Sequence, residues 1–262
     1  MAYKLAVVGG GNMGAALVGG LLQGGWAPEH LAVVELSAAR AAQLGELFPG
    51  VAVTSEIPPC EAALIAVKPY DVAVACAAAA RAGATRLLSI AAGISIAALQ
   101  DAAGPDVTVV RAMPNTPALV GEGAAAIAGG STATEDDLAW AESILGAVGI
   151  VVRVPEHQLD AVTGLAGSGP AYVFLVAEAL TEAGVLAGLT RANSEQLVAQ
   201  LLVGSAKLLA ERGDPSRLRA EVTSPGGTTA AGLRVLEEHG VRSAFLEAVM
   251  AAAARSAELG RH

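Results

Sequence analysis

Leu5-Ala6-Val7-Val8-Gly9-Gly10-Gly11-Asn12-Met13-Gly14 is the stretch that decides the fold of this chain of 262 residues. Four apolar residues typical of a buried strand lead into glycines at positions 9, 11 and 14, and a helical pattern follows from Ala15. In dinucleotide-binding domains, such glycines let the backbone approach a pyrophosphate at a helix N-terminus. The placement predicts a dinucleotide site, and the alternative is a glycine turn with a purely structural role.

An acid, Glu35, follows 21 positions after Gly14, at the expected end of the next strand. A carboxylate there accepts hydrogen bonds from the ribose hydroxyls of NADH and repels the 2′-phosphate of NADPH. Ser37 and Arg40 lie just beyond and would be able to bind that phosphate if Glu35 turned away. The sequence therefore favours NADH, with a solvated loop acid as the alternative role for Glu35.

The first half of the chain alternates short apolar runs with Ala- and Leu-rich stretches, as parallel βαβ units do. The expected strands are residues 5–8, 31–35, 63–67, 87–90, 107–111 and 124–128. From about Asp160 the pattern changes to long helical segments without convincing strands. We predict an α/β dinucleotide-binding domain over residues 1–155 and an all-α domain over residues 156–262.

The composition excludes several classes of partner. The formal net charge is −9 and the chain has only three lysines, Lys4, Lys68 and Lys207, so no basic face for nucleic acid is expected. Cys60 and Cys76 lack metal-ligand spacing and are expected to be free thiols in a reducing cytoplasm. No signal peptide is recognised, and charged residues or glycines interrupt the Ala-rich stretches before a bilayer-spanning length. We expect a soluble cytoplasmic protein that binds small metabolites, without metal, nucleic-acid or membrane partners.

A second anion site is indicated by Ser-Pro-Gly-Gly-Thr-Thr at residues 224–229. Ser224 would cap a helix that has Pro225 in its first position, and the glycines would leave backbone amides uncovered for a carboxylate. The alternative is an ordinary capped helix start. Three further loops follow expected strands at the edge where ligands bind in open α/β sheets, namely residues 66–69, 90–93 and 113–117.

Six motifs together resemble the pyrroline-5-carboxylate reductase family. They are GGGNMG, AVKP, SIAAGIS, RAMPNTPALV, DAVTGLAGSGPAYVF and SPGGTT, and the match runs from about residue 4 to about residue 258. The resemblance implies an N-terminal Rossmann domain, a C-terminal helical dimerisation domain, and reduction of 1-pyrroline-5-carboxylate to L-proline with NADPH or NADH. It also implies a homodimer that assembles further, in some members into a decamer.

The same resemblance assigns residues to each ligand. The cofactor-binding residues would be Val8, Gly9, Gly10, Gly11, Asn12, Met13, Gly14, Glu35, Ala66, Val67, Lys68, Pro69, Ile90, Ala91 and Ala92. The substrate-binding residues would be Glu156, Ser224, Gly226, Gly227, Thr228 and Thr229, with the Thr229 hydroxyl reaching the ring nitrogen as the catalytic group. Members of the family often carry Ser or Thr where this chain has Glu35. Some relatives have Asn where this chain has Glu221, so no cofactor contact is carried over to Glu221.

Two other functions remain open at this stage. A β-hydroxyacid dehydrogenase has the same domain order but needs a lysine in its helical domain, and Lys207 stands in a continuous helix pattern without a nearby Asn. A non-catalytic dinucleotide sensor would have no need of the anion site at residues 224–229. Helical segments 172–176 and 197–209 are apolar around most of their circumference, which favours an oligomer over a monomeric bundle.

Overall fold

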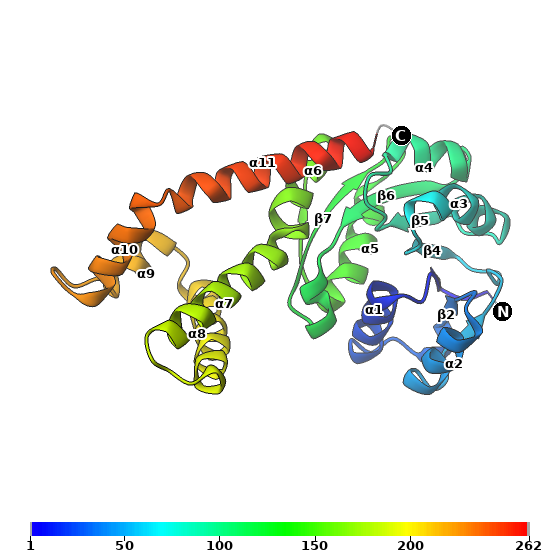
Figure 1. Cartoon of the computed structure of the whole chain (residues 1–262). Coiled ribbons are helices and arrows are strands. Elements are labelled where there is room, and N and C mark those ends of the chain that lie inside the picture. Colours follow the sequence, from blue (N-terminus) through cyan, green and yellow to red (C-terminus); the bar gives the residue numbers. More distant parts are fainter. Residues whose placement is uncertain (1, 261–262) are drawn as a thin grey trace. The chain divides into compact units, whose positions relative to one another are not determined.

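The computed structural model describes residues 2–260 of the chain (Figure 1). It contains two compact units. The first runs to Ser168 and takes up the chain again from Met250, and the second spans Gly169–Val249. Residues 156–168 therefore pack with the first unit, although the sequence prediction assigned them to the helical domain.

The first unit is built on one eight-stranded sheet with the order β3-β2-β1-β4-β5-β6-β7-β8. The strands are β1 Leu5–Val8, β2 Leu31–Val34, β3 Ala52–Thr54, β4 Ala62–Ile65, β5 Arg86–Ser89, β6 Thr108–Met113, β7 Gly123–Gly129 and β8 Gly149–Arg153. All neighbours are parallel except β6 and β7. The first six strands have the order of a doubly wound dinucleotide-binding sheet, so the predicted α/β Rossmann fold is confirmed.

The helices are α1 Asn12–Gln23, α2 Ala38–Leu47, α3 Val72–Arg81, α4 Ile96–Ala103, α5 Glu135–Leu145, α6 Leu159–Val162, α7 Gly169–Leu186, α8 Arg191–Arg212, α9 Pro215–Glu221, α10 Thr228–Glu238 and α11 Val241–Leu259. A π-helical turn, Thr163–Gly167, separates α6 from α7. All six predicted strands are present within two residues at each end. The prediction missed β3, which has only three residues, and β8, a partly exposed edge strand.

The residues of β1 alternate between the two faces of the sheet. Leu5 and Val7 belong to a buried cluster with residues of α1, α2 and α5, and Ala6 and Val8 belong to a second cluster with α3 and α4. All four side chains are buried, as expected for a parallel strand covered on both faces. The first unit is therefore a three-layer sandwich, in which helices cover both faces of the sheet.

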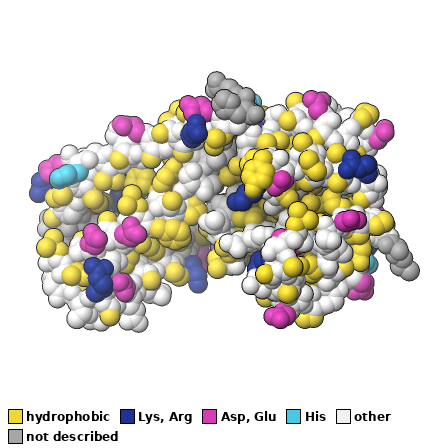
Figure 2. Space-filling view, turned by 45° about the vertical axis from the view of Figure 1, so that its right-hand side comes forward, with side chains coloured by type: hydrophobic (Ala, Val, Ile, Leu, Met, Phe, Trp, Pro, Cys, Tyr) yellow, Lys and Arg dark blue, Asp and Glu magenta, His cyan; other side chains and the backbone are white. Residues whose placement is uncertain are grey.

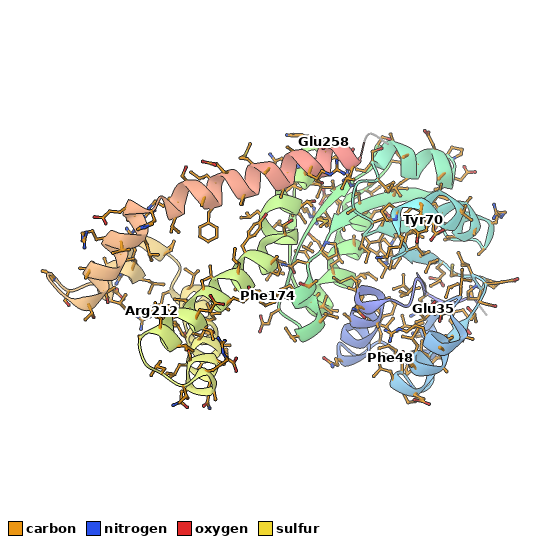
Figure 3. All side chains as sticks on the ribbon, viewed as in Figure 1. Glu35, Phe48, Tyr70, Phe174, Arg212 and Glu258 are labelled. Carbon is orange, nitrogen blue, oxygen red and sulfur yellow. The ribbon has the colours of Figure 1, made fainter. Side chains whose placement is uncertain are left out.

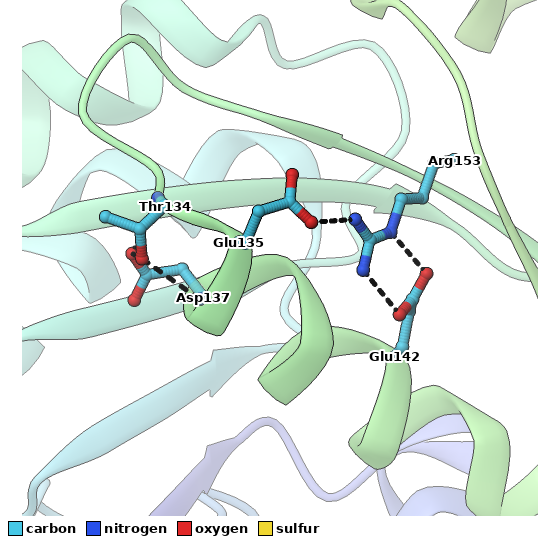
Figure 4. Close-up of polar contacts among 5 residues, drawn as sticks. All are labelled: Thr134, Glu135, Asp137, Glu142 and Arg153. Carbon is cyan, nitrogen blue, oxygen red and sulfur yellow. Dashed lines mark hydrogen bonds and ion pairs between the residues drawn. The ribbon is translucent and has the colours of Figure 1, made fainter.

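Arg153 at the end of β8 forms ion pairs with two acids of α5 (Figure 4). Its Nε and Nη2 atoms lie 2.6 and 2.9 Å from the two carboxylate oxygens of Glu142, and Nη1 lies 2.5 Å from Oε2 of Glu135. The hydrogen bonds from Arg153 lower the pKa of Glu142. The bidentate pair thus connects the end of β8 with α5 at the exposed edge of the sheet.

The second unit exposes large apolar side chains. Ser194 of α8 donates a hydrogen bond of 2.8 Å to the carbonyl of Thr181, and Gly184 of α7 leaves room for its side chain, so α7 and α8 pack closely. Phe174 projects from α7 with 64% of its surface exposed (Figure 3). Figure 2 shows hydrophobic side chains across this unit, and the exposed ones include Val173, Leu175, Leu197, Leu201 and Leu246.

One helical stretch, Glu156–Leu186, is long and apolar enough to cross a membrane by length and composition alone. The most apolar 18 residues of this 31-residue stretch have a mean hydropathy of 1.3, and 11% of them are buried. Glu178, Glu182 and Gly184 lie within it, so acids and a glycine interrupt this stretch as expected, although they do not end helix α7.

Candidate functional site

A pocket of about 1010 Å³ opens at the carboxyl ends of the parallel strands. It lies where the strand order reverses, between β1 and β4, which is the position that ligands occupy in open α/β sheets. Its walls include the ends of β1 and β2, the loops after β4 and β5, and Met113 and Pro114. The volume is at the upper end of the range for small-molecule and cofactor pockets, about 300–1,000 Å³.

The glycine turn between β1 and α1 brings the backbone to the pocket surface. Gly9 has a φ of +111°, and a Cβ there would lie 2.6 Å from the carbonyl oxygen of Ala66. Gly14 also has no room for a side chain, because a Cβ there would clash with the Gly9 carbonyl oxygen. A Cβ on Gly11 would meet no protein atom within 4 Å, so the space beside Gly11 is open. The turn therefore fits a pyrophosphate, which needs close backbone on one side and open space on the other.

Helix α1 begins directly at this turn without a side-chain cap. Gly11 is the N-cap residue, no side chain accepts a hydrogen bond there, and the first turn contains no acidic residue. The first amides of a helix have no intrahelical partner and carry the positive end of the helix dipole. The start of α1 is thus open to an anionic group.

Glu35 faces the glycine turn from the end of β2 (Figure 3). Its Oε2 accepts a hydrogen bond from the Gly10 amide at 3.1 Å, and its Oε1 accepts one from the Ser37 amide at 2.8 Å. Arg40 donates from Nε to the Gly10 carbonyl at 2.8 Å and lines a separate cavity of about 480 Å³. Glu35 therefore borders the pocket while Arg40 is held outside it.

The structure brings most of the predicted cofactor residues together. Val8, Gly9, Gly11, Asn12, Met13, Gly14, Glu35, Ala66, Val67, Lys68, Ile90 and Ala92 line the pocket. Gly10, Pro69 and Ala91 do not line it. Gly10 lies against Leu44 and Glu35, Pro69 begins a 3₁₀ turn, and Ala91 is buried.

Several pocket residues were missed by the sequence prediction. Leu36, Glu56, Asp71, Val74 and Arg81 also line the cavity. They come from different loops and helices and share no motif, so only the folded arrangement assembles them. Leu36 and Val74 are 83% and 71% exposed, so they add apolar surface to the pocket wall.

The start of α10 in the second unit differs from the prediction. Ser224 is not an N-cap: its carbonyl accepts a hydrogen bond from the Gly227 amide at 3.0 Å, and Gly226 has a φ of +69°. Proline followed by a glycine with positive φ is the pattern of a type II turn. Helix α10 begins at Thr228 with Gly227 as N-cap, and no side chain caps it. The uncapped amides are therefore those of Thr228 and Thr229, and Pro225 precedes the helix.

Glu156 lies in the first unit, outside the dinucleotide pocket. Its Oε1 accepts hydrogen bonds from the Ile96 amide at 2.6 Å and from Nη1 of Arg111 at 3.0 Å. The Arg111 side chain is 11% exposed and that of Glu156 is 36% exposed, so the arginine is buried while the carboxylate still meets solvent. Glu156 thereby ties the segment before α6 to the start of α4.

Both cysteines are buried free thiols, as predicted. Burial raises the pKa of Cys60 and of Cys76 to about 11, which leaves them protonated at neutral pH. Among residues 2–260, no group of three or more His, Cys, Asp or Glu side chains is placed to hold a metal ion.

The doubly wound sheet and its glycine-rich pocket are those of a dinucleotide-binding protein. Residues 4–93 match a family model described as NADP oxidoreductase, coenzyme F420-dependent, and residues 156–259 match one described as pyrroline-5-carboxylate reductase dimerisation. The chain is 45% identical to the pyrroline-5-carboxylate reductase of Synechocystis sp., with 100% of both chains covered. It is 40% identical to that of Corynebacterium melassecola, covering 98% of this chain and 99% of the relative. The chain belongs to the pyrroline-5-carboxylate reductase family.

Solved structures of the same family are also similar to this chain. A pyrroline-5-carboxylate reductase from Coxiella burnetii superimposes with a TM-score of 0.92 at 35% identity, with 99% of each chain covered. A pyrroline carboxylate reductase from Plasmodium falciparum with NADP bound gives a TM-score of 0.85 at 31% identity, with 98% of each chain covered.

Proposed function

We propose that this protein reduces the C=N bond of 1-pyrroline-5-carboxylate to give L-proline, using a reduced nicotinamide dinucleotide. The observation that carries the proposal is the Ser-Pro-Gly-Gly-Thr-Thr turn, which leaves the N-terminus of α10 uncapped in addition to that of α1. A chain that only senses a dinucleotide needs one anion site. Two uncapped helix starts suit a cofactor pyrophosphate and a substrate carboxylate.

We assign the dinucleotide to the pocket of the first unit, with residues 8–14 at the pyrophosphate, residues 66–69 beside it and residues 90–92 on the nicotinamide side. Support comes from the open space at Gly11 and the close approach of Gly9 to Ala66. Gly10, Pro69 and Ala91 would act by shaping the turns, since they do not line the cavity.

The proposed cofactor preference is NADH over NADPH. Glu35 borders the pocket with both oxygens directed at backbone amides, where ribose hydroxyls would be able to replace them. Arg40, the cation that would favour a 2′-phosphate, is bonded to the Gly10 carbonyl. Glu56 adds a second acid to the wall and strengthens the repulsion of a phosphate.

We assign the substrate carboxylate to Ser224 and to the backbone of residues 226–229, and the ring nitrogen to the Thr229 hydroxyl. The amides at the start of α10 have no side-chain cap, which supports the first assignment. The second rests on the position of Thr229 in the first turn of α10. Glu156 is proposed as a residue on the substrate side, and its carboxylate is already bonded to Ile96 and Arg111.

The bound reduced nicotinamide supplies the hydride in this chemistry. A cyclic imine is basic enough to arrive partly protonated, so the protein needs a group that orients the nitrogen more than it needs a strong acid. The Thr229 hydroxyl suits that task and would also relay a proton through water. Fixing the carboxylate at one end of the ring would limit the orientations of its C=N bond, which provides much of the rate.

We also propose a homodimer that assembles further, with a decamer as one candidate, and a cytoplasmic location. The exposed apolar side chains of the second unit support assembly, as does the dimerisation family that covers it. On this proposal the apolar stretch Glu156–Leu186 is covered by subunit contacts, not by a membrane.

The test is the loss of absorbance of reduced nicotinamide with 1-pyrroline-5-carboxylate and each cofactor in turn. We expect oxidation of both cofactors, with a higher kcat/KM for NADH. A β-hydroxyacid substituted for the imine, assayed with oxidised cofactor, is the control for the competing dehydrogenase function. Turnover of the hydroxyacid alone would overturn the proposal.

A further inference from the structure

The loop between β5 and α4 forms one wall of the dinucleotide pocket. Ile90 and Ala92 line the pocket, and Gly93, with a φ of +77°, turns the chain toward the start of α4 at Ile96. The loop spans only a few residues, so a shift of Gly93 would move Ile90 and Ala92 with it. The contacts that hold Gly93 in place therefore affect the shape of the pocket.

The last turn of α11 lies directly against Gly93. A Cβ on Gly260 would be 2.9 Å from the Gly93 carbonyl oxygen, and a Cβ on Gly93 would be 3.5 Å from the carbonyl carbon of Leu259. The two backbones thus approach each other closely. In Figure 1 the red end of α11 reaches the segment that precedes α4.

A partly buried hydrogen bond anchors this turn. The Ser256 hydroxyl donates to Oδ1 of Asp160 in α6 at 2.7 Å, and Ser256 is 5% exposed. The Gly260 amide donates to the Ser256 carbonyl at 3.1 Å, which links the anchor to the contact with Gly93. A bond to a charged, partly buried acceptor is stronger than a neutral one, so it suits a fixed position.

Asp160 follows closely on Glu156, whose carboxylate bonds the Ile96 amide at the start of α4. The short segment 156–160 therefore holds the loop from two directions. Glu156 fixes the end where α4 begins, and Asp160 fixes the helix that rests on Gly93.

We propose that the last turn of α11 is a positioning element of the dinucleotide pocket, with Ser256 and Asp160 as positioning residues that act through Gly93. This proposal rests on the proposed function, because it assumes that the 90–93 loop contacts the cofactor. The consequence is that breaking the Ser256 to Asp160 bond weakens binding of the cofactor without touching any residue that lines the pocket.

The experiment compares Ser256→Ala and Asp160→Ala with Asp160→Asn, which keeps an oxygen acceptor. Ser243→Ala is the matched control, because Ser243 lies on the same helix and also donates to a carboxylate, that of Glu247 at 2.9 Å. Reduced cofactor is titrated into each full-length variant by nicotinamide fluorescence, and steady-state kinetics give the KM for the imine.

We expect the cofactor Kd to rise about threefold to tenfold in Ser256→Ala and Asp160→Ala, the range that follows from losing one hydrogen bond. Asp160→Asn and Ser243→Ala should bind as the wild type does, and the KM for the imine should stay within about twofold, since its proposed contacts lie in residues 224–229. Unchanged Kd values in both alanine variants, or an equal rise in Ser243→Ala, would overturn the proposal.

Gly260→Val provides a second route should Asp160→Ala fail to fold. It leaves the anchor intact but presses a side chain onto the Gly93 carbonyl, and it lies near the chain end. It should also raise the cofactor Kd, and wild-type affinity in this variant would count against the proposal. Failure of the wild type to reduce the imine while it still binds cofactor would refute the proposed function and leave this inference standing.

Discussion

Helices α5 and α1 belong to the same unit and begin in opposite ways. At α5 the Thr134 side chain accepts from the Asp137 amide at 3.3 Å, Asp137 bonds back to the Thr134 amide at 2.9 Å, and three acids occupy the first turn. At α1 there is a glycine N-cap with no side-chain bond and no acid. A helix start satisfied by its own side chains is structural, whereas an unsatisfied one is available to an anion. Helix α10 begins in the second way.

The largest effect is expected where a side chain fills the open space at α1. Gly11→Val should fold, because the new Cβ meets no protein atom, but it should lower cofactor affinity by about a hundredfold or more by occupying the place of the pyrophosphate. Equilibrium titration of cofactor measures the loss, and circular dichroism checks the fold. A folded variant with normal affinity would show that α1 does not hold the cofactor.

The uncapped start of α10 is tested by two neighbouring variants. Thr229→Ala should lower kcat about tenfold to a hundredfold, because a contact to the reacting nitrogen changes as hydride arrives. Ser224→Ala should mainly raise the KM for the imine, because a carboxylate contact is the same in ground and transition states. Cofactor Kd serves as the control for both. Equal losses of kcat at the two positions would refute the division of roles.

A smaller effect is expected from the acid beside the α1 turn. Glu35→Ser should shift the ratio of kcat/KM values toward NADPH by about 1–2 kcal/mol, the scale of one charged hydrogen bond. Glu46→Ser, an exposed acid in α2 that does not line the pocket, is the matched control. A wild type that already prefers NADPH by a large factor would contradict the assignment of Glu35.

A substitution at the capped start of α5 should change the stability of the protein but not its binding of cofactor. Burial would raise the pKa of Asp137, but hydrogen bonds with the side chain and backbone of Thr134, together with Arg86 at 2.9 Å, lower it overall. Since the folded state favours the carboxylate, its contribution is present above the unfolded pKa, about 3.9, and disappears as pH falls through the lowered folded value.

Asp137→Asn should therefore unfold about 1–2 kcal/mol more easily near pH 7 and approach the wild type in acid. Urea unfolding at several pH values measures this. The variant should bind cofactor normally at neutral pH. A large change in cofactor affinity would contradict the view that a capped helix start has only a structural role.

The sequence predicted the features that depend on local spacing. The turn at residues 9–14 was predicted because strand, glycines and helix are contiguous. The start of α10 was predicted three residues too early, because Ser-Pro fits both a helix start and the first half of a type II turn, and only the positive φ of Gly226 distinguishes them. Glu56, Val74 and Arg81 were missed because the fold alone brings them to one pocket. The contact of Gly260 with Gly93 is equally invisible in the sequence.

The central claim is that two uncapped helix starts hold two different ligands, and hydrogen–deuterium exchange tests it most directly. Reduced dinucleotide alone should slow exchange in peptides covering residues 9–14 and leave residues 224–230 unchanged. Adding L-proline, the proposed product, should then slow exchange in residues 224–230, while the capped start of α5 at residues 134–137 stays constant throughout. Proline that leaves residues 224–230 unprotected, or dinucleotide that protects residues 134–137 as strongly as residues 9–14, would contradict the account.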